Sequence, residues 1–92
     1  MLGNTKGKQL YNYIPDYVLF DLETTGISRN TDEVIEISAV KVRNGRVVDE
    51  FSQLVNPGKS IPYAASMVNN ITNQMVRNAP HFDRVLEYFV NF

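Results

Sequence analysis

The sequence has no cysteine and no tryptophan among its 92 residues. Without cysteine the protein can hold neither disulfides nor cysteine-ligated zinc, and it cannot use a thiolate in catalysis. Neither sign of charge dominates, because nine lysines and arginines stand against ten aspartates and glutamates. The resulting net charge of −1 gives no overall positive field that would attract a nucleic-acid backbone. Any contact with phosphates therefore needs a local source of positive charge.

Long hydrophobic runs are also missing, so we expect no membrane-spanning helix. The first nine residues are polar and lack the apolar segment of a secretory signal. With 43% hydrophobic and 21% charged residues, the composition is that of an ordinary globular domain. These features predict a cytoplasmic protein with one modest core, which forms one domain or part of one.

The residue pattern divides the chain into a short arm and a folded part. Residues 1–12 show no helical or strand periodicity and predict a flexible N-terminal arm, whereas residues 13–92 carry regular patterns. The segment Tyr17–Asp21 is rich in β-branched and aromatic residues. Such a run predicts a first strand that is buried on both faces.

A β-hairpin is predicted next. From Val34, apolar and polar residues alternate as in a strand with one buried face. The expected buried residues of this strand are Ile35, Ile37 and Ala39. Asn44-Gly45 lies between two β-rich runs and is a strong hairpin signal, because both turn positions need positive φ. The third strand, residues 47–55, therefore runs antiparallel to the second.

Helices are predicted in the rest of the chain. Residues 63–68 can form about two turns before Asn69 and Asn70, which favour a left-handed helix end. Thr72 can cap a further short turn, and Pro80 precedes a final amphipathic helix. The apolar residues of that helix follow the i, i+3, i+4, i+7, i+8 spacing: Phe82, Val85, Leu86, Phe89 and Val90. The pattern stops with the chain, and we interpret this as an interrupted domain.

Asp21 and Glu23 carry the clearest chemical signal in the sequence. Positions i and i+2 of a strand project to the same side, so the two carboxylates lie next to each other. Both are acids that repel each other when ionised, unless a cation binds between them. Oxygen ligands favour Mg²⁺ or Mn²⁺, and two such ions about 3.5–4 Å apart support in-line attack on a phosphodiester. Two carboxylates do not neutralise the positive charge of two divalent ions, so further acidic ligands are expected.

The segment around this acid pair resembles a known family. Residues 17–26, Tyr-Val-Leu-Phe-Asp-Leu-Glu-Thr-Thr-Gly, are similar to the first motif of the DnaQ-like branch of the DEDD superfamily of 3′-to-5′ exonucleases. That branch includes proofreading subunits of DNA polymerase III. Residues 33–37 resemble the family's next strand, and residues 56–75 resemble its Pro … Val-His-Gly-Ile-Thr … Met stretch. The resemblance covers residues 17–92.

The resemblance implies a partial RNase H-like α/β fold, with a three-stranded, largely antiparallel sheet, short helices and one amphipathic C-terminal helix. Asp21 and Glu23 would then be the catalytic ligands of two Mg²⁺ or Mn²⁺ ions. The residues expected to bind the terminal nucleotide are Thr24, Thr25, Ile61, Val68 and Asn69. The family's second and third motifs, which supply two more aspartates and a histidine, have no match here. Residues 13–92 are therefore expected to be the N-terminal half of an exonuclease-like domain.

Structural roles are expected for the remaining acids and for the single histidine. Asp83 suits the first turn of the last helix, where the helix dipole favours an acid. His81 is expected to face solvent at the start of that helix, although it could act as a general base. Glu33 is expected to be a charged residue that flanks the second strand, and Glu36 a charged residue on one of its faces.

Three functions are compatible with the sequence. The leading one is a metal-dependent 3′-to-5′ exonuclease of the DNA polymerase III proofreading type, which binds the 3′ end of single-stranded DNA and works with a DNA polymerase. The exonuclease would be incomplete and inactive in the form of this 92-residue chain. The second is a non-catalytic module derived from an exonuclease, which forms a homo-oligomer through the apolar face of the C-terminal helix. The third is an oligoribonuclease-type enzyme that acts on RNA.

Overall fold

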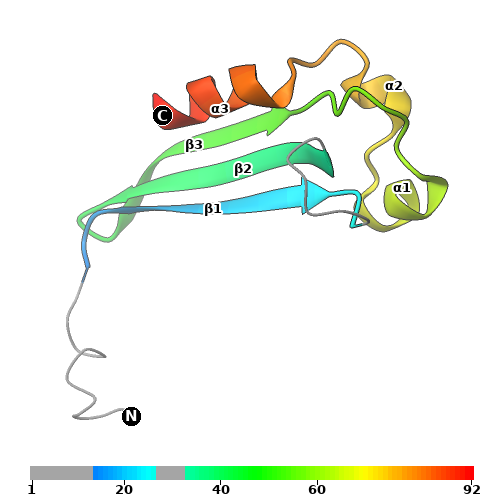
Figure 1. Cartoon of the computed structure of the whole chain (residues 1–92). Coiled ribbons are helices and arrows are strands. Elements are labelled where there is room, and N and C mark those ends of the chain that lie inside the picture. Colours follow the sequence, from blue (N-terminus) through cyan, green and yellow to red (C-terminus); the bar gives the residue numbers. More distant parts are fainter. Residues whose placement is uncertain (1–13, 27–32) are drawn as a thin grey trace.

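The computed structural model describes residues 14–26 and 33–92, so the predicted arm at residues 1–12 lies outside the described residues. In the described part, three strands are followed by three helices (Figure 1). The strands are β1 (Tyr17–Thr24), β2 (Val34–Arg43) and β3 (Arg46–Leu54). The helices are α1 (Tyr63–Asn69), α2 (Asn73–Val76) and α3 (Phe82–Val90). This arrangement confirms the predicted sheet, short helices and final amphipathic helix.

The three strands form an antiparallel sheet in the order β1-β2-β3. The β2–β3 hairpin turns at Asn44 and Gly45, whose φ angles of 53° and 74° are both positive, as predicted. The turn is also attached to the chain before β1. The N–H of Asn44 donates to Asp16 Oδ1, and the N–H of Gly45 donates to the carbonyl of Pro15, both at 3.0 Å. The hairpin turn therefore helps to set where β1 begins to pair with β2.

The helix ends follow the predicted local signals. α1 ends at Asn70, which has a left-handed φ of 63° and donates its N–H to the carbonyl of Ser66. Thr72 Oγ1 accepts the N–H of Met75 at 3.2 Å and so caps α2. In the described part of the chain, no helix is long and apolar enough to cross a membrane.

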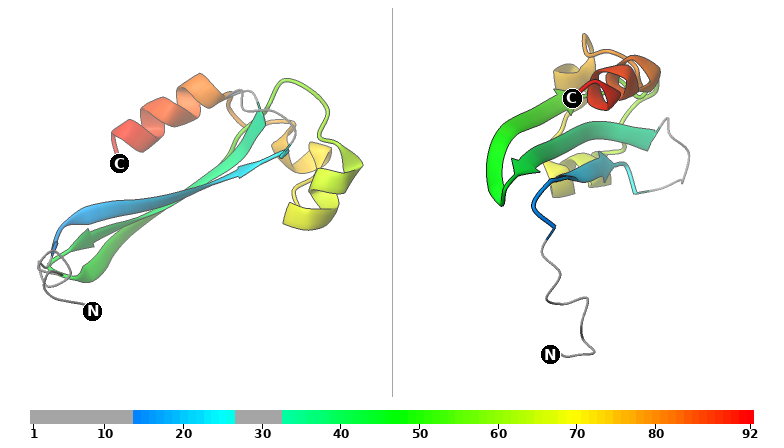
Figure 2. Two further views of the ribbon diagram at one scale, coloured as in Figure 1. Left: turned by 60° about the horizontal axis from the view of Figure 1, so that its bottom comes forward. Right: turned by 90° about the vertical axis from the view of Figure 1, so that its left-hand side faces the viewer.

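Hydrophobic packing falls into two clusters, and β2 contributes to both. The buried residues packed with α1 and α2 are Ile35, Ile61, Ala65, Ile71 and Val76. The buried residues packed with α3 are Val34, Ile37, Val55 and Val85. Figure 2 shows α3 lying along one face of the sheet, with α1 and α2 beyond the end of the strands. The alternation predicted for β2 is confirmed, because Ile35, Ile37 and Ala39 are all buried.

The prediction that β1 is buried on both faces is wrong. Its large apolar side chains are between 41% and 64% exposed: Tyr17, Val18, Leu19, Phe20 and Leu22. The physical reason is the strand order, because β1 lies at an edge and β2 is the only described strand that pairs with it. α3 contacts β1 through the ring of Phe89, whose centroid is 5.4 Å from that of Phe20. In the described part of the chain, β1 is therefore an exposed edge strand despite its apolar composition.

The apolar face of α3 is only partly exposed, because the sheet covers much of it. Val85 is fully buried, and Phe82 and Phe89 are partly buried against the same cluster. Leu86 and Val90 are exposed, with Val90 at 73%. Most of the apolar face of α3, which the sequence analysis proposed for self-association, therefore packs against the sheet of the same chain.

Replacing Val85 by alanine is expected to destabilise the fold. The change removes two buried methyl groups from a fully packed site and should lower the free energy of unfolding by about 2 kcal/mol. Val90→Ala, on the same helix, makes the same chemical change at an exposed position and should stay within about 0.5 kcal/mol. Urea denaturation followed by circular dichroism measures both variants. Equal losses would contradict the assignment of Val85 to the core.

Candidate active site

Asp21 and Glu23 lie on the same face of β1. Asp21 pairs with Ser38 and Glu23 with Glu36 in the β1–β2 ladder. The register is unbroken from Tyr17 to Glu23 and shifts only between Glu23 and Thr24. Because side chains alternate along an unbroken strand, the two carboxylates project from one side of the sheet. We call these two residues the acid pair.

A third carboxylate, that of Glu36, lies on the same face of the sheet. Glu36 is directly opposite Glu23, and its Oε2 accepts a hydrogen bond from Ser52 Oγ at 3.3 Å. Like charges directly opposite each other on neighbouring strands destabilise a sheet, and a cation between them relieves this repulsion. Among the described residues, no three acids, histidines or cysteines lie close enough together to hold a metal ion. The donor set suits a hard divalent cation, but it supplies only part of a full coordination shell.

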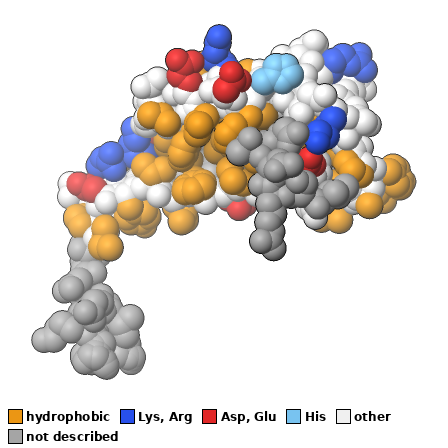
Figure 3. Space-filling view, viewed as in Figure 1, with side chains coloured by type: hydrophobic (Ala, Val, Ile, Leu, Met, Phe, Trp, Pro, Cys, Tyr) orange, Lys and Arg blue, Asp and Glu red, His pale blue; other side chains and the backbone are white. Residues whose placement is uncertain are grey.

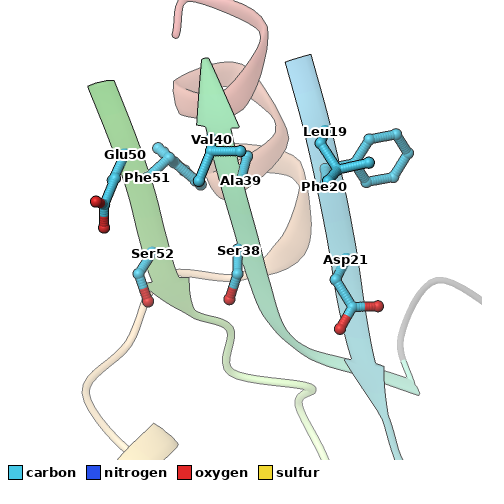
Figure 4. A pocket seen from close by; sticks show the side chains of 9 residues that line it. All are labelled: Leu19, Phe20, Asp21, Ser38, Ala39, Val40, Glu50, Phe51 and Ser52. Carbon is cyan, nitrogen blue, oxygen red and sulfur yellow. The ribbon is translucent and has the colours of Figure 1, made fainter. Parts of the chain in front are cut away.

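A shallow pocket of about 570 Å³ lies over the open face of the sheet beside Asp21. Asp21, Ser38 and Ser52 line it as a polar row that crosses all three strands (Figure 4). Leu19 and Val40 form an apolar row next to it. Asp21 is therefore accessible to solvent and to a bound ion or substrate.

A second pocket, of about 310 Å³, lies between the end of β1 and α1. It brings together five of the seven residues that the sequence analysis selected: Glu23, Thr24, Thr25, Val68 and Asn69. Asp21 lies outside it, in the pocket over the sheet. Ile61 also lies outside it, because its side chain is buried in the core beneath α1.

Hydrogen bonds between side chains and the backbone shape this second pocket, and one of them connects its two sides. The N–H of Gly26 donates to Thr24 Oγ1 at 3.1 Å, and Gly26 has a φ of 76°, which lets the chain turn away from β1. Asn69 Nδ2 donates to the carbonyl of Thr24 at 3.4 Å, and its Oδ1 accepts the N–H of Ile71 at 3.0 Å. The Asn69 side chain thus joins the end of α1 to the end of β1.

Glu33 is a residue whose role the sequence analysis missed. It precedes β2 as expected, but it is buried, with Thr25 Oγ1 donating to its Oε1 at 2.5 Å and Lys59 Nζ 2.6 Å from its Oε2. The Lys59 ammonium, followed by the Thr25 hydroxyl, lowers the pKa of the Glu33 carboxyl below its ordinary value of 4.5. An ionised Glu33 therefore ties the end of β1 to the segment before α1.

His81 and Asp83 lie at the start of α3, as expected. His81 is exposed, and its Nδ1 is 3.1 Å from the carbonyl oxygen of Asn56. Asp83 occupies the first turn of α3 and accepts the N–H of Arg84 at 2.9 Å. Both residues thus have local contacts that account for their positions.

The family comparison agrees with this fold. A family model described as "Exonuclease", that of RNase T, matches residues 18–92. The chain therefore belongs to this exonuclease family, within its DnaQ-like branch. Exonucleases of this family generally use divalent metal ions.

PolC-type DNA polymerases III are among its relatives. The enzyme of Clostridium perfringens is 47% identical over 77 residues, and that of Caldanaerobacter subterraneus is 43% identical over 77 residues. Each alignment covers 84% of this chain but only 5% and 6%, respectively, of the polymerase. The chain thus spans a small part of the relatives that it matches.

Two solved structures share the fold. Exonuclease X in complex with 5′ overhanging duplex DNA superimposes with a TM-score of 0.69 at 30% identity, covering 78% of this chain and 42% of that one. A full-length 3′-exonuclease superimposes with a TM-score of 0.72 at 24% identity, covering 87% of this chain and 29% of that one. The partial RNase H-like fold predicted from the sequence is therefore confirmed.

Replacing Glu33 by glutamine is expected to destabilise the chain in a pH-dependent way. The pKa of the Glu33 carboxyl is lower in the folded state than its ordinary value of 4.5. The ionised carboxyl therefore makes its full contribution to the free energy of unfolding well above pH 4.5, and this contribution is lost as the pH falls through the folded-state pKa. The urea midpoint of Glu33→Gln should therefore lie below that of the parent chain at pH 7, and the difference should shrink below pH 4.5. Equilibrium unfolding at several pH values measures this.

A matched control is Glu87→Gln on α3. Glu87 forms an exposed pair with Arg84 at 3.4 Å, and such surface pairs contribute little to stability. Its urea midpoint should stay close to that of the parent chain. A Glu33→Gln deficit that is the same at pH 7 and pH 3 would show that the ion pair does not cause it.

Proposed function

We propose that the chain is the N-terminal part of a metal-dependent 3′-to-5′ exonuclease domain of the DNA polymerase III proofreading type. The observation that carries this proposal is the acid pair on one face at the end of β1, in a chain that belongs to the exonuclease family. The substrate is the 3′ end of single-stranded DNA, and the product is a nucleoside monophosphate. A DNA polymerase is the proposed partner, because the relatives quoted above are PolC-type polymerases.

Mg²⁺ or Mn²⁺ is the proposed cofactor, and Asp21 and Glu23 are its proposed ligands. When bound, two such ions make a water nucleophilic and stabilise the leaving oxygen. Asp21 offers an exposed carboxylate over the open sheet face, where it would hold the ions. Glu23 lines the pocket between β1 and α1, where its carboxylate would hold one ion and orient the water. Nearby Glu36 adds to the negative potential that favours cations there.

The proposed site for the terminal nucleotide is the pocket between β1 and α1. Thr24 lies against the nucleotide, and Val68 supplies an exposed apolar surface for its base or sugar. Thr25 and Asn69 line the same pocket, and their hydrogen bonds to Glu33 and to the Thr24 carbonyl hold its walls. For Ile61 we propose an indirect contribution, through its packing against Ala65 beneath α1.

We further propose that the 92-residue chain alone has negligible activity. The acid pair supplies two ligands, whereas two divalent ions need more negative charge, and the exposed His81 at the start of α3 is bonded to Asn56. Catalysis then requires additional carboxylates and a general base from the rest of an exonuclease domain.

A chimaeric polymerase tests this function. Residues 17–92 replace the matching segment of the Clostridium perfringens PolC-type polymerase, to which the chain is 47% identical. We expect release of nucleoside monophosphates from single-stranded DNA that depends on Mn²⁺ or Mg²⁺. Asp21→Asn and Glu23→Gln should each lower the rate by about 100-fold or more, since each removes a charged ligand from the metal site.

Asp49→Asn on β3 is the matched control, because it neutralises an exposed strand carboxylate outside both pockets. Its rate should equal that of the unmodified chimaera. Full activity in the Asp21→Asn chimaera would disprove the role of the acid pair. Robust turnover by the 92-residue chain alone, lost in Asp21→Ala, would instead disprove the proposal that the chain is incomplete.

A further inference from the structure

Glu33 is a buried carboxylate whose two oxygens hold two different segments of the chain. Thr25 Oγ1 donates to Oε1 at 2.5 Å, and Lys59 Nζ lies 2.6 Å from Oε2. Thr25 follows the end of β1, whereas Lys59 belongs to the segment that leads into α1. The main chain of Glu33 holds the same strand end, because its carbonyl accepts the N–H of Thr25 at 3.0 Å. One residue thus connects the two elements that enclose the pocket between β1 and α1.

These contacts lie where the pairing of β1 with β2 becomes irregular. The register shifts between Glu23, which pairs with Glu36, and Thr24, which pairs with Val34. A shift of this kind interrupts the ladder and can redirect a side chain. The ladder holds the chain on the Glu23 side of the shift, and Glu33 holds it on the other side through Thr25. The directions of the Glu23 and Thr24 side chains therefore depend on both attachments.

A weaker contact joins the same two elements at the end of α1. Asn69 Nδ2 donates to the Thr24 carbonyl at 3.4 Å, which is long for a hydrogen bond. The contacts of the Glu33 carboxylate are shorter, and hydrogen bonds to an ionised group are about twice as strong as neutral ones. Glu33 is therefore the main connection between the end of β1 and the chain that enters α1.

Glu33 is poorly suited to hold a metal ion itself. Both of its oxygens already accept hydrogen bonds, and the Lys59 ammonium repels a second cation. The same contact accounts for the position of Lys59. On the face that Figure 3 shows, the described lysine and arginine side chains lie in several separate places around a hydrophobic area, and they form no continuous basic strip. The ion pair therefore acts on the shape of the pocket and adds no net charge to it.

We propose that Glu33 is a positioning residue that sets the width of the pocket between β1 and α1, and with it the place of the terminal nucleotide relative to the acid pair. Its effect on the reaction rests on the proposed exonuclease function, whereas its effect on the pocket rests on its own contacts. Rates respond steeply to placement, since a displacement of about 1 Å can cost about 100-fold. In this role Glu33 touches neither the substrate nor a metal ion and acts through Thr25 and Lys59.

Amide hydrogen exchange of the 92-residue chain tests the attachment without any activity. Lys59→Met removes the ammonium group and should speed the exchange of the Thr25 N–H by about fivefold or more, although that N–H donates to the Glu33 carbonyl and not to Lys59. The N–H of Val55, which donates to Ile35 in the core, should keep its rate. An unchanged Thr25 rate, or an equal increase at Val55, would overturn the proposal.

Kinetics of the chimaeric polymerase test the effect on the reaction. Glu33→Gln and Lys59→Met each remove one partner of the same ion pair. Each should lower kcat by about 10-fold, because the nucleotide is held less well against the acid pair. KM for single-stranded DNA should change by less than about threefold, since neither residue touches the strand. The double variant should be no slower than the slower single variant, because both changes remove one shared contact.

Val85→Ala is the matched control, because it weakens the core beneath α3 and leaves both walls of the pocket intact. Its kcat should equal that of the unmodified chimaera. An active chimaera in which Glu33→Gln keeps the full kcat, in which Val85→Ala loses as much, or in which the double variant shows the product of the two losses, would overturn the positioning role. An unmodified chimaera without activity would instead count against the exonuclease function, and the exchange rate of Thr25 then decides the role of Glu33.

Discussion

The pairing of β1 with β2 is the interaction on which the other features depend. Hydrogen bonds fix the two ends of β1, from the Gly45 N–H to Pro15 and from the Thr25 N–H to Glu33, both at 3.0 Å. The ladder between them is unbroken until Glu23, so the faces of β1 are assigned without ambiguity. The acid pair lies on the open face of the sheet, and Phe20 lies on the face that α3 covers. A slip of one residue would exchange these faces and remove the acid pair from its neighbours on the sheet.

Local signals explain why much of the fold could be predicted from the sequence. Asn44-Gly45, Asn70 and Thr72 each act through their own backbone or a neighbour within four residues, and each performs the predicted turn or cap. The exposure of β1 could not be predicted in this way. An apolar run has the same composition in a central strand and at an edge, and only the strand order separates the two cases.

In the candidate site, too, local spacing predicted some features and contacts between distant residues determined others. The acid pair was predicted because two positions along one strand suffice to place two carboxylates together. The role of Glu33 was missed because its partners are eight and 26 residues away, at Thr25 and Lys59, and no local pattern relates them. The same long-range packing puts Ile61 into the core instead of the pocket between β1 and α1. Contacts between distant segments, and not strand periodicity, therefore decide the positions of Glu33 and Ile61.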